Sequence, residues 1–397
     1  MYTVLINALI GCGIVSSFPQ FSMTIGDLAE KSGLSYGVLM TGDTVKSVGI
    51  VLGMLVSGFF YNRFGQTKVF VFSMVASILP QFLILHVSSV FLFMGLKFIQ
   101  GTAAIIFPVF LVIILNRVSE KNAGISTAVF NGIFYAGGGI GGTMAGFVIA
   151  EYGWAASYYV LGAVQIVTGL VWLFTVKEVP RKNAAPVVSG ADRNFMASPV
   201  LWLLALSFFA TTWGVQAITV DWAIYGEWLG YDELSLGKVM SAVTAGMILS
   251  CVFSGKTSDF FSFGSEKKGQ RRLFVLMAGH LLIIVSVCFL IFGDMKNFNL
   301  FYAATFLFAF SCSWGLGAFY AILPEIYDEK KVPVVTGVAG GVGDMGMPLA
   351  PMVVGVYFGL KGLWDVGWVS CAVIACLGFI AGIALLFILR KKPLLHE

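Results

Sequence analysis

Long apolar runs recur along the whole chain, and their length limits what it can fold into. A helix needs about 20 mostly apolar residues to cross a bilayer, and about twelve stretches reach that length. They are residues 3–24, 36–61, 69–88, 90–115, 123–150, 154–176, 199–226, 234–262, 273–293, 298–323, 333–360 and 365–389. Each run is too long for a barrel strand, so the sequence predicts an all-α membrane protein with twelve transmembrane helices.

The composition agrees with this reading. The 397 residues are 58% hydrophobic and only 11% charged, and the mean hydropathy is +0.91. Soluble domains are about 45–50% apolar and about 25% charged. We therefore expect the chain to fold in a bilayer rather than in water.

Lysine and arginine are unequally distributed between the spans. If the spans alternate in direction, one face carries only Lys31, Lys296 and Lys361, and the other face carries the remaining basic residues of the connecting loops. Cytoplasmic loops are enriched in these residues. Both termini are therefore expected in the cytoplasm, and we expect the membrane to be a bacterial inner membrane. No basic groove with interleaved aromatic residues accompanies these loops, so they do not indicate nucleic-acid binding.

The sequence lacks the residues that metal binding and enzyme catalysis require. The six cysteines lie in apolar spans without a CxxC pair, and there are three histidines, so no metal-ligand set is expected. The sequence offers no nucleophile with a neighbouring base and no phosphate-binding loop. We expect neither an enzyme nor a bound cofactor or metal.

The chain divides near its middle at the polar interval KEVPRKNAAPVVSGADRNFMASP. We expect an N-terminal six-helix bundle at 1–176, a cytoplasmic central loop at 177–198, and a C-terminal six-helix bundle at 199–397 with a short cytoplasmic tail. A weak repeat supports the division: TAVFNGIFYAGGGIGGTMAG from Thr127 parallels TGVAGGVGDMGMPLAPMVVG from Thr336. Two pseudo-symmetric bundles of this kind are typical of secondary transporters.

Lys46 and Lys97 lie within apolar spans, where a charge costs roughly 2.5–3.5 kcal/mol. Lys46 follows Asp43 by three residues, so the two can pair on one helix face. The pair is either structural or faces a cavity, where Lys46 holds an anion or passes a proton. Lys97 has no acidic neighbour within a turn, so its partner comes from another helix, from water or from substrate. It serves either a substrate or coupling role, or a fixed salt bridge.

Asp344, in GGVGDMGMP, is the acid that the sequence places deep in the second half. Its counterpart in the repeat is Tyr135, and the two could face one another across the pseudo-symmetry axis. Asp344 either takes part in proton coupling or substrate contact, or pairs structurally with Lys46 or Lys97. If both lysines reach a cavity, the preferred ligand is an anion, and protonation of Asp344 would change the pairs formed between the halves.

Polar and aromatic side chains on other spans could complete a binding site, although helix packing alone would also explain them. They are Gln20, Asn131, Tyr135, Trp213, Gln216, Ser311 and Trp314. A further acidic group near the end of the seventh span, namely Asp221, Glu227, Asp232 and Glu233, is expected to be solvated loop charge.

Several motifs resemble those of the major facilitator superfamily. GFFYNRFGQTK resembles its loop motif G-x-x-x-D-R-x-G-R-R, GKTSDFF followed by KKGQRR resembles the partner loop, and LKFIQGTAA resembles R-F-x-Q-G-x-G-A. LPEIYDEKKVPVVTG resembles the end of the tenth helix of many members, and the resemblance covers essentially the whole chain. It implies the major facilitator fold, a fourth helix that lines the central cavity, and gating by Gly58, Asn62, Arg63, Gly65 and Asp259.

Three departures from the family pattern carry information. Asn62 replaces the usual aspartate, which predicts a weaker charge interaction with the facing helix. Lys97 occupies a position where arginine is usual, and it provides a compact ammonium charge instead of a planar guanidinium group that can bind in a bidentate manner. The fifth span has no proline after its glycines, unlike the drug and proton antiporters of the family.

We therefore predict a secondary active transporter that moves a small organic anion, a mono- or dicarboxylate, by alternating access. We expect proton symport and a functional monomer. One alternative is a proton-driven exporter of drugs or lipids, which the proline-free fifth span disfavours. Another is a non-transporting membrane sensor, which the short loops disfavour.

Overall fold

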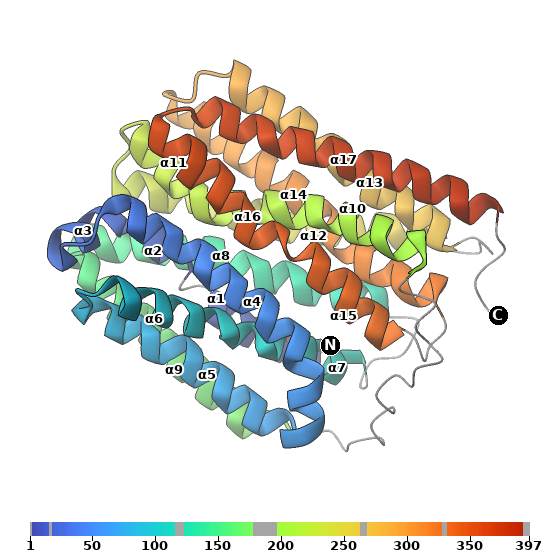
Figure 1. Cartoon of the computed structure of the whole chain (residues 1–397), viewed down its shortest axis with the longest axis horizontal. Coiled ribbons are helices and arrows are strands. Elements are labelled where there is room, and N and C mark those ends of the chain that lie inside the picture. The colour runs from blue at the N-terminus through green and yellow to red at the C-terminus, as the bar shows by residue number, and fades with distance from the viewer. Residues whose placement is uncertain are drawn as a thin grey trace.

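The computed structural model describes residues 2–15, 18–115, 123–177, 197–262, 268–327 and 332–391 (Figure 1). Within these ranges the chain is helical and contains no strand. Helices satisfy every backbone donor and acceptor within one segment, which a bilayer requires. The predicted all-α membrane fold is confirmed.

The first half consists of the following helices. They are α1 (Tyr2–Val15), α2 (Phe18–Met23), α3 (Ile25–Ser32), α4 (Tyr36–Phe64), α5 (Gln66–Leu83), η1 (Ile84–His86), α6 (Val90–Thr102), η2 (Ala103–Ile105), α7 (Ile106–Leu115), α8 (Ala123–Tyr152) and α9 (Trp154–Thr175).

The second half follows the interval 178–196, which lies outside the described residues. Its helices are α10 (Pro199–Gln216), η5 (Ala217–Asp221), α11 (Trp222–Trp228), α12 (Glu233–Ser262), α13 (Lys268–Phe292), α14 (Phe298–Ile326), α15 (Val332–Gly343), α16 (Gly346–Pro351), η6 (Met352–Phe358), η7 (Gly359–Lys361) and α17 (Trp364–Lys391). The segments η5 and η6 are π-helical.

Ten helices in the described ranges are long and apolar enough to cross a membrane. The other two predicted spans are also helical but divided. The span predicted at 3–24 forms α1 and α2, on either side of residues 16 and 17, which are not described. The span predicted at 333–360 forms α15 and α16, separated by a turn at Asp344 and Met345, and continues as η6 and η7.

The two sets of helices lie side by side, the first in the lower part and the second in the upper part of Figure 1. They meet along α8 and α12, and where α4 packs against α15 and α16. The helices α3 and α11 lie at the left-hand end of Figure 1, which we call the α3 end. In the predicted topology this end faces outward.

Two glycines bring α4 and α6 into close contact. A side chain at Gly101 would overlap the carbonyl group of Lys46, and one at Gly49 would overlap the carbonyl of Phe98. Small residues at such crossings let helix backbones approach closely in a membrane. This approach places Lys46 and Lys97 beside one another.

We expect Gly101→Ala to destabilise the protein, because the added methyl group must push α6 away from α4. Overpacking of this kind costs about 1–3 kcal/mol. Gly95→Ala on the same helix is the matched control, because a side chain there meets nothing within 4 Å. Thermal unfolding of the purified variants in detergent measures both. Equal melting temperatures would contradict the close contact between α4 and α6.

Candidate functional site

A small cavity lies between the two halves. Its volume is about 40 Å³, and cavities need roughly 10–15 Å³ to hold one water molecule, so it has room for only a few heavy atoms. Most of the lining is apolar, and Gln216 and Thr219 supply polar groups. The lining residues are Ile14, Ile50, Met54, Ala104, Ile106, Phe134, Gly138, Val215, Gln216, Thr219 and Met347.

Side chains from both halves meet on each side of this cavity. Towards the α3 end, the Tyr36 hydroxyl of α4 donates a hydrogen bond to Glu227 Oε2 of α11 at 3.3 Å. Towards the opposite end, the rings of Phe107 and Tyr320 have centroids 6.5 Å apart. Phe107 also packs edge-on against Phe134, which lines the cavity. The arrangement therefore surrounds the cavity on both sides.

Three charged side chains, Asp43, Lys46 and Lys97, form what we call the charge cluster. The Lys46 Nζ atom lies 2.6 Å, and the Lys97 Nζ atom 3.1 Å, from the same carboxylate oxygen, Asp43 Oδ1. All three side chains are buried. The Lys97 ammonium also lies 3.2 Å from the centroid of the Phe21 ring, within the range of a cation–π contact.

The charge cluster adjoins the cavity. Lys46 precedes the lining residue Ile50 by four positions on α4, so both lie on the same helix face. Ser47, the next residue, accepts a hydrogen bond from Gln216 Nε2 at 3.3 Å. Because Gln216 belongs to α10, this bond connects the helix that carries the cluster to the second half.

The charge cluster contains more positive than negative groups. With all three groups ionised, two ammonium groups face one carboxylate, which leaves an excess of positive charge. The second carboxylate oxygen, Asp43 Oδ2, is buried without a hydrogen-bond partner. Two unit charges 4 Å apart interact by about 4 kcal/mol at an effective dielectric constant of about 20. The excess of positive charge can therefore attract an anion.

The structure thus gives each lysine an acidic partner. The expected pairing of Asp43 with Lys46 is confirmed as a contact. The partner of Lys97, which the sequence left open, is the same Asp43 on another helix. Whether the cluster binds substrate stays a prediction.

Gln20 lies in a buried chain of amide and hydroxyl groups within the first half. It donates to Ser157 Oγ at 3.0 Å and accepts from Gln81 Nε2 at 2.6 Å. Gln100, three residues after Lys97, donates to Gln81 Oε1 at 3.4 Å. Of these residues only Gln20 was predicted from the sequence, although a polar residue within an apolar span was the available signal for the others too.

Two further candidates have unsatisfied buried groups. Asn131 lies on the same face of α8 as Phe134 and Gly138, which line the cavity, and neither its amide nitrogen nor its amide oxygen has a partner. The indole nitrogen of Trp213 has no nitrogen or oxygen partner and interacts with the Cys371 thiol, and its ring packs against Phe209. The Tyr135 side chain lies outside the described residues, so its predicted role stays untested.

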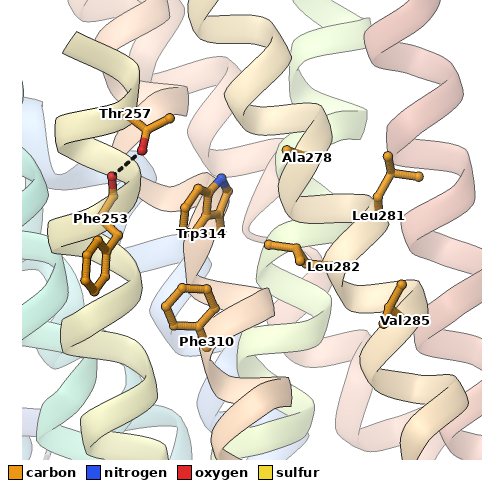
Figure 2. Close-up of a pocket in the computed structure, with 8 residues that line it drawn as sticks. All are labelled: Phe253, Thr257, Ala278, Leu281, Leu282, Val285, Phe310 and Trp314. Atoms are coloured by element: carbon orange, nitrogen blue, oxygen red, sulfur yellow. Dashed lines mark hydrogen bonds between the residues drawn. The ribbon is translucent and has the colours of Figure 1, made fainter. Parts of the chain in front are cut away.

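Trp314 and Ser311 lie elsewhere. Ser311 donates to the Leu307 carbonyl of its own helix at 2.6 Å, as helix-packing hydroxyls do. Trp314 lines a separate apolar groove between α12, α13 and α14, with Phe253 and Leu282 among its neighbours (Figure 2). The groove contains none of the residues that line the cavity. The expectation that Trp314 belongs to the central site finds no support in this geometry.

Asp344 occupies the turn that separates α15 from α16. Its carbonyl accepts the Met347 amide at 2.9 Å, and Met347 lines the cavity. The side chain is buried and its Oδ1 atom has no hydrogen-bond partner. No ion pair among the described residues involves Asp344, so the possible pairing with Lys46 or Lys97 is absent in this arrangement.

Asp221 was misinterpreted from the sequence. It was expected to be solvated loop charge, yet only 1% of it is exposed. It ends the π-helical η5, between the buried residues Val220 and Trp222. Its apolar neighbours on both sides were the signal that the sequence offered.

The predicted gating residues lie at the end opposite α3. Asp259 Oδ1 accepts a hydrogen bond from the Arg272 guanidinium at 2.9 Å. Arg272 also donates to Glu325 Oε1 at 2.7 Å and to Ser258 Oγ at 2.8 Å, which joins α12, α13 and α14. Only Asp259 of this group was predicted from the sequence.

The corresponding loop of the first half contains Gly65, which separates α4 from α5 with φ at 82°, a conformation that favours glycine. Arg63 is exposed, and its guanidinium carbon lies 5.7 Å from the centroid of the Phe64 ring. Gly58 and Asn62 belong to α4, but the Asn62 side chain and the surroundings of Gly58 are not described. Gating by these residues stays a prediction.

The family model of the Major Facilitator Superfamily matches residues 4–268 and 260–397. The chain belongs to the major facilitator superfamily of transporters. Together with the ten membrane-length helices in the described ranges, this membership identifies an integral membrane protein.

Curated relatives of this superfamily member are distant and cover most of its length. A nitrite extrusion protein of Bacillus subtilis is 23% identical over 85% of this chain and 82% of its own. A putative niacin/nicotinamide transporter of Bacillus subtilis, NiaP, is 22% identical over 79% of this chain and 77% of its own. A probable nitrate/nitrite transporter of Mycobacterium tuberculosis, NarK2, is 24% identical over 82% of both chains.

We expect Asp43→Asn to be strongly destabilising, because it leaves two buried lysines without their counter-charge. Removing one partner of a buried ion pair costs about 3–5 kcal/mol. Adding Lys97→Gln should recover part of the loss, since one unpaired charge is then removed. Thermal unfolding of the two single variants and the double variant measures this coupling. Strictly additive losses would contradict the shared ion pair.

Proposed function

We propose that this protein is a secondary active transporter that moves a small organic anion, a mono- or dicarboxylate, together with protons by alternating access. The observation that carries the proposal is the charge cluster, in which two buried lysines share one carboxylate oxygen beside a small cavity. The relatives named for nitrite, nitrate and niacin support a small substrate. The relatives named for nitrite and nitrate also support an anionic one.

The charge cluster suggests how an anion is held. Asp43 occupies the position that a substrate carboxylate would take between Lys46 and Lys97. An incoming anion can replace Asp43 at one lysine, because the cluster has more positive than negative charge. Lysine provides a compact charge with rotatable donors and does not require a planar bidentate ligand. The site therefore suits small carboxylates of differing shape.

Proton coupling can act on the same group. Asp43 Oδ2 has no hydrogen-bond partner, but the two ammonium groups at Oδ1 favour the ionised form, so Asp43 takes a proton only once an anion has displaced one of them. Protonation neutralises Asp43, weakens its hold on both lysines and increases the positive charge presented to the substrate. Anion binding and proton binding then favour one another. Asp344, at the turn within a divided helix, remains a second candidate for the coupled proton.

The surrounding structure supports alternating access. Asn131, Trp213 and Gln216 supply polar groups near the cavity, and the bond from Gln216 to Ser47 must break when the halves separate. Discontinuous helices at membrane depth, such as α15 and α16, are typical of transporter sites. We further propose a bacterial inner membrane, cytoplasmic termini and a functional monomer.

Export of a drug is the second candidate. A bicyclomycin resistance protein homolog of Haemophilus influenzae is 23% identical over 83% of this chain and 76% of its own. The small volume of the cavity favours the anion instead. Transport of amphiphilic drugs without transport of carboxylates would decide for the exporter.

Lys97→Gln tests the proposal. Losing one charged partner of a buried contact costs about 2 kcal/mol or more, so carboxylate affinity should fall at least about 30-fold. Uptake of radiolabelled monocarboxylates and dicarboxylates into proteoliposomes measures the loss.

Lys238→Gln is the matched control, because Lys238 is an exposed lysine on α12 and lies outside the site. It should transport at the rate of the unmodified chain. A correctly folded Lys97→Gln protein that also transports carboxylates normally would exclude Lys97 from the site.

A further inference from the structure

Asp221 is a buried carboxyl group of the second half at the interface with α4. It lies at the end of the π-helical η5, which follows the cavity-lining residues Gln216 and Thr219. A π-helical turn contains an extra residue, which changes the direction in which the following side chains point, and such turns are frequent at functional sites. The Asp221 Oδ2 atom is buried without a hydrogen-bond partner.

Two other segments enclose the Asp221 carboxyl group. A methyl group at Gly355 of η6 would overlap Asp221 Oδ1, so the carboxyl group rests directly against the η6 backbone. The same methyl group would lie 3.2 Å from Met40 Cε of α4. Met40 precedes Asp43 by three residues, on the same face of α4. Asp221 therefore lies where η5, η6 and the helix of the charge cluster meet.

No positive charge faces Asp221 in the described part of the chain. The segments packed against η5 are α2, α10, α11, α14, α16 and η6. Their ionisable side chains are Tyr225 and Glu227 of α11, Tyr302, Cys312, Tyr320 and Glu325 of α14, and Tyr357 of η6. Beyond them, Asp221 interacts electrostatically with Asp43 of α4 and with the Cys371 thiol of α17.

This environment is unfavourable for an ionised carboxylate. Lys46 and Lys97 bond to Asp43, so the charged group of α4 that acts on Asp221 is itself a carboxylate. A charge buried without a partner costs several kcal/mol, whereas a neutral carboxyl group is tolerated far better. The closed arrangement of η5, η6 and α4 therefore suits Asp221 only in its neutral form.

We propose that Asp221 binds the proton that is co-transported with the anion, and that its neutralisation allows the halves to close at the α3 end. While Asp221 is ionised, closing η5 and η6 against α4 would bury a carboxylate beside Asp43. Once a proton has bound, the same movement buries a neutral group. Because this closure also encloses an anion held by Lys46 and Lys97, the proton and the anion cross together. The inference rests on the proposed anion transport.

Asp221→Asn tests this role, because asparagine has the shape of a protonated carboxyl group but cannot release a proton. With one proton per monovalent anion, a gradient of about 2 pH units supports up to about 100-fold accumulation in proteoliposomes held at zero membrane potential. The unmodified chain should approach this value. The variant should accumulate no substrate, while exchange of labelled for unlabelled carboxylate without a gradient continues within about threefold.

The control is Asp365→Asn, which removes an exposed carboxyl group at the start of α17 and should accumulate substrate like the unmodified chain. In weakly buffered detergent, substrate binding to the unmodified chain should also take up a proton, and Asp221→Asn should take up less. Three results would overturn the assignment: pH-driven accumulation by the variant equal to that of the unmodified chain, accumulation driven by sodium instead of protons, or a variant that does not fold.

These outcomes are separable from failure of the proposed function. Exchange without a gradient, and its loss in Lys97→Gln, depend on the anion site alone. If exchange requires Lys97 but the unmodified chain ignores the pH gradient, anion transport stands and the role of Asp221 is wrong. If no carboxylate exchanges at all, the anion proposal is wrong as well, and the Asp221 proposal fails with it.

Discussion

The ion pairs that Asp43 forms with Lys46 and Lys97 are the interaction on which the interior of the first half depends. Two ammonium groups at membrane depth need a counter-charge, and one carboxylate supplies it for both. The contact requires α4 and α6 to approach closely, and Gly49 and Gly101 permit that approach. The position of Lys97 therefore depends on two things together: the close packing of α4 against α6, and the counter-charge of Asp43.

The interior of the first half has an excess of positive charge, whereas the interior of the second half has unpaired carboxyl groups. The first half supplies both buried lysines, and the second half supplies Asp221 and Asp344, neither of which has an ion pair among the described residues. An excess of positive charge in one half favours an anion, and unpaired carboxyl groups in the other can take protons. This asymmetry is a physical reason for the proposed transport of an anion together with a proton. The anion would neutralise the excess positive charge of the first half, and the proton would neutralise a carboxylate of the second half.

The sequence could predict those features of the fold and the site that depend on local patterns. Helical spans follow from apolar runs, and the pairing of Asp43 with Lys46 follows from a spacing of three residues. The contact of Lys97 with Asp43 joins two helices, so it depends on packing that one sequence does not specify. Asp221 was misjudged because it lies near the end of a long span, where acidic residues are often solvated. Its apolar neighbours indicate burial, but the π-helical turn that directs it inward leaves no sequence pattern. Trp314 was selected by residue type alone, and the groove in which it lies is formed by three helices.

The central claim is that the charge cluster binds a small carboxylate, and equilibrium binding tests it most directly. Thermal unfolding of the purified protein would be measured with small carboxylates, nitrate, nitrite, sugars and amphiphilic cations. A ligand present at about 100 times its dissociation constant stabilises the folded state by roughly 2.7 kcal/mol. The account predicts stabilisation by carboxylates that disappears in Lys97→Gln. Stabilisation by sugars or amphiphilic cations alone would contradict it and leave both lysines with a structural role.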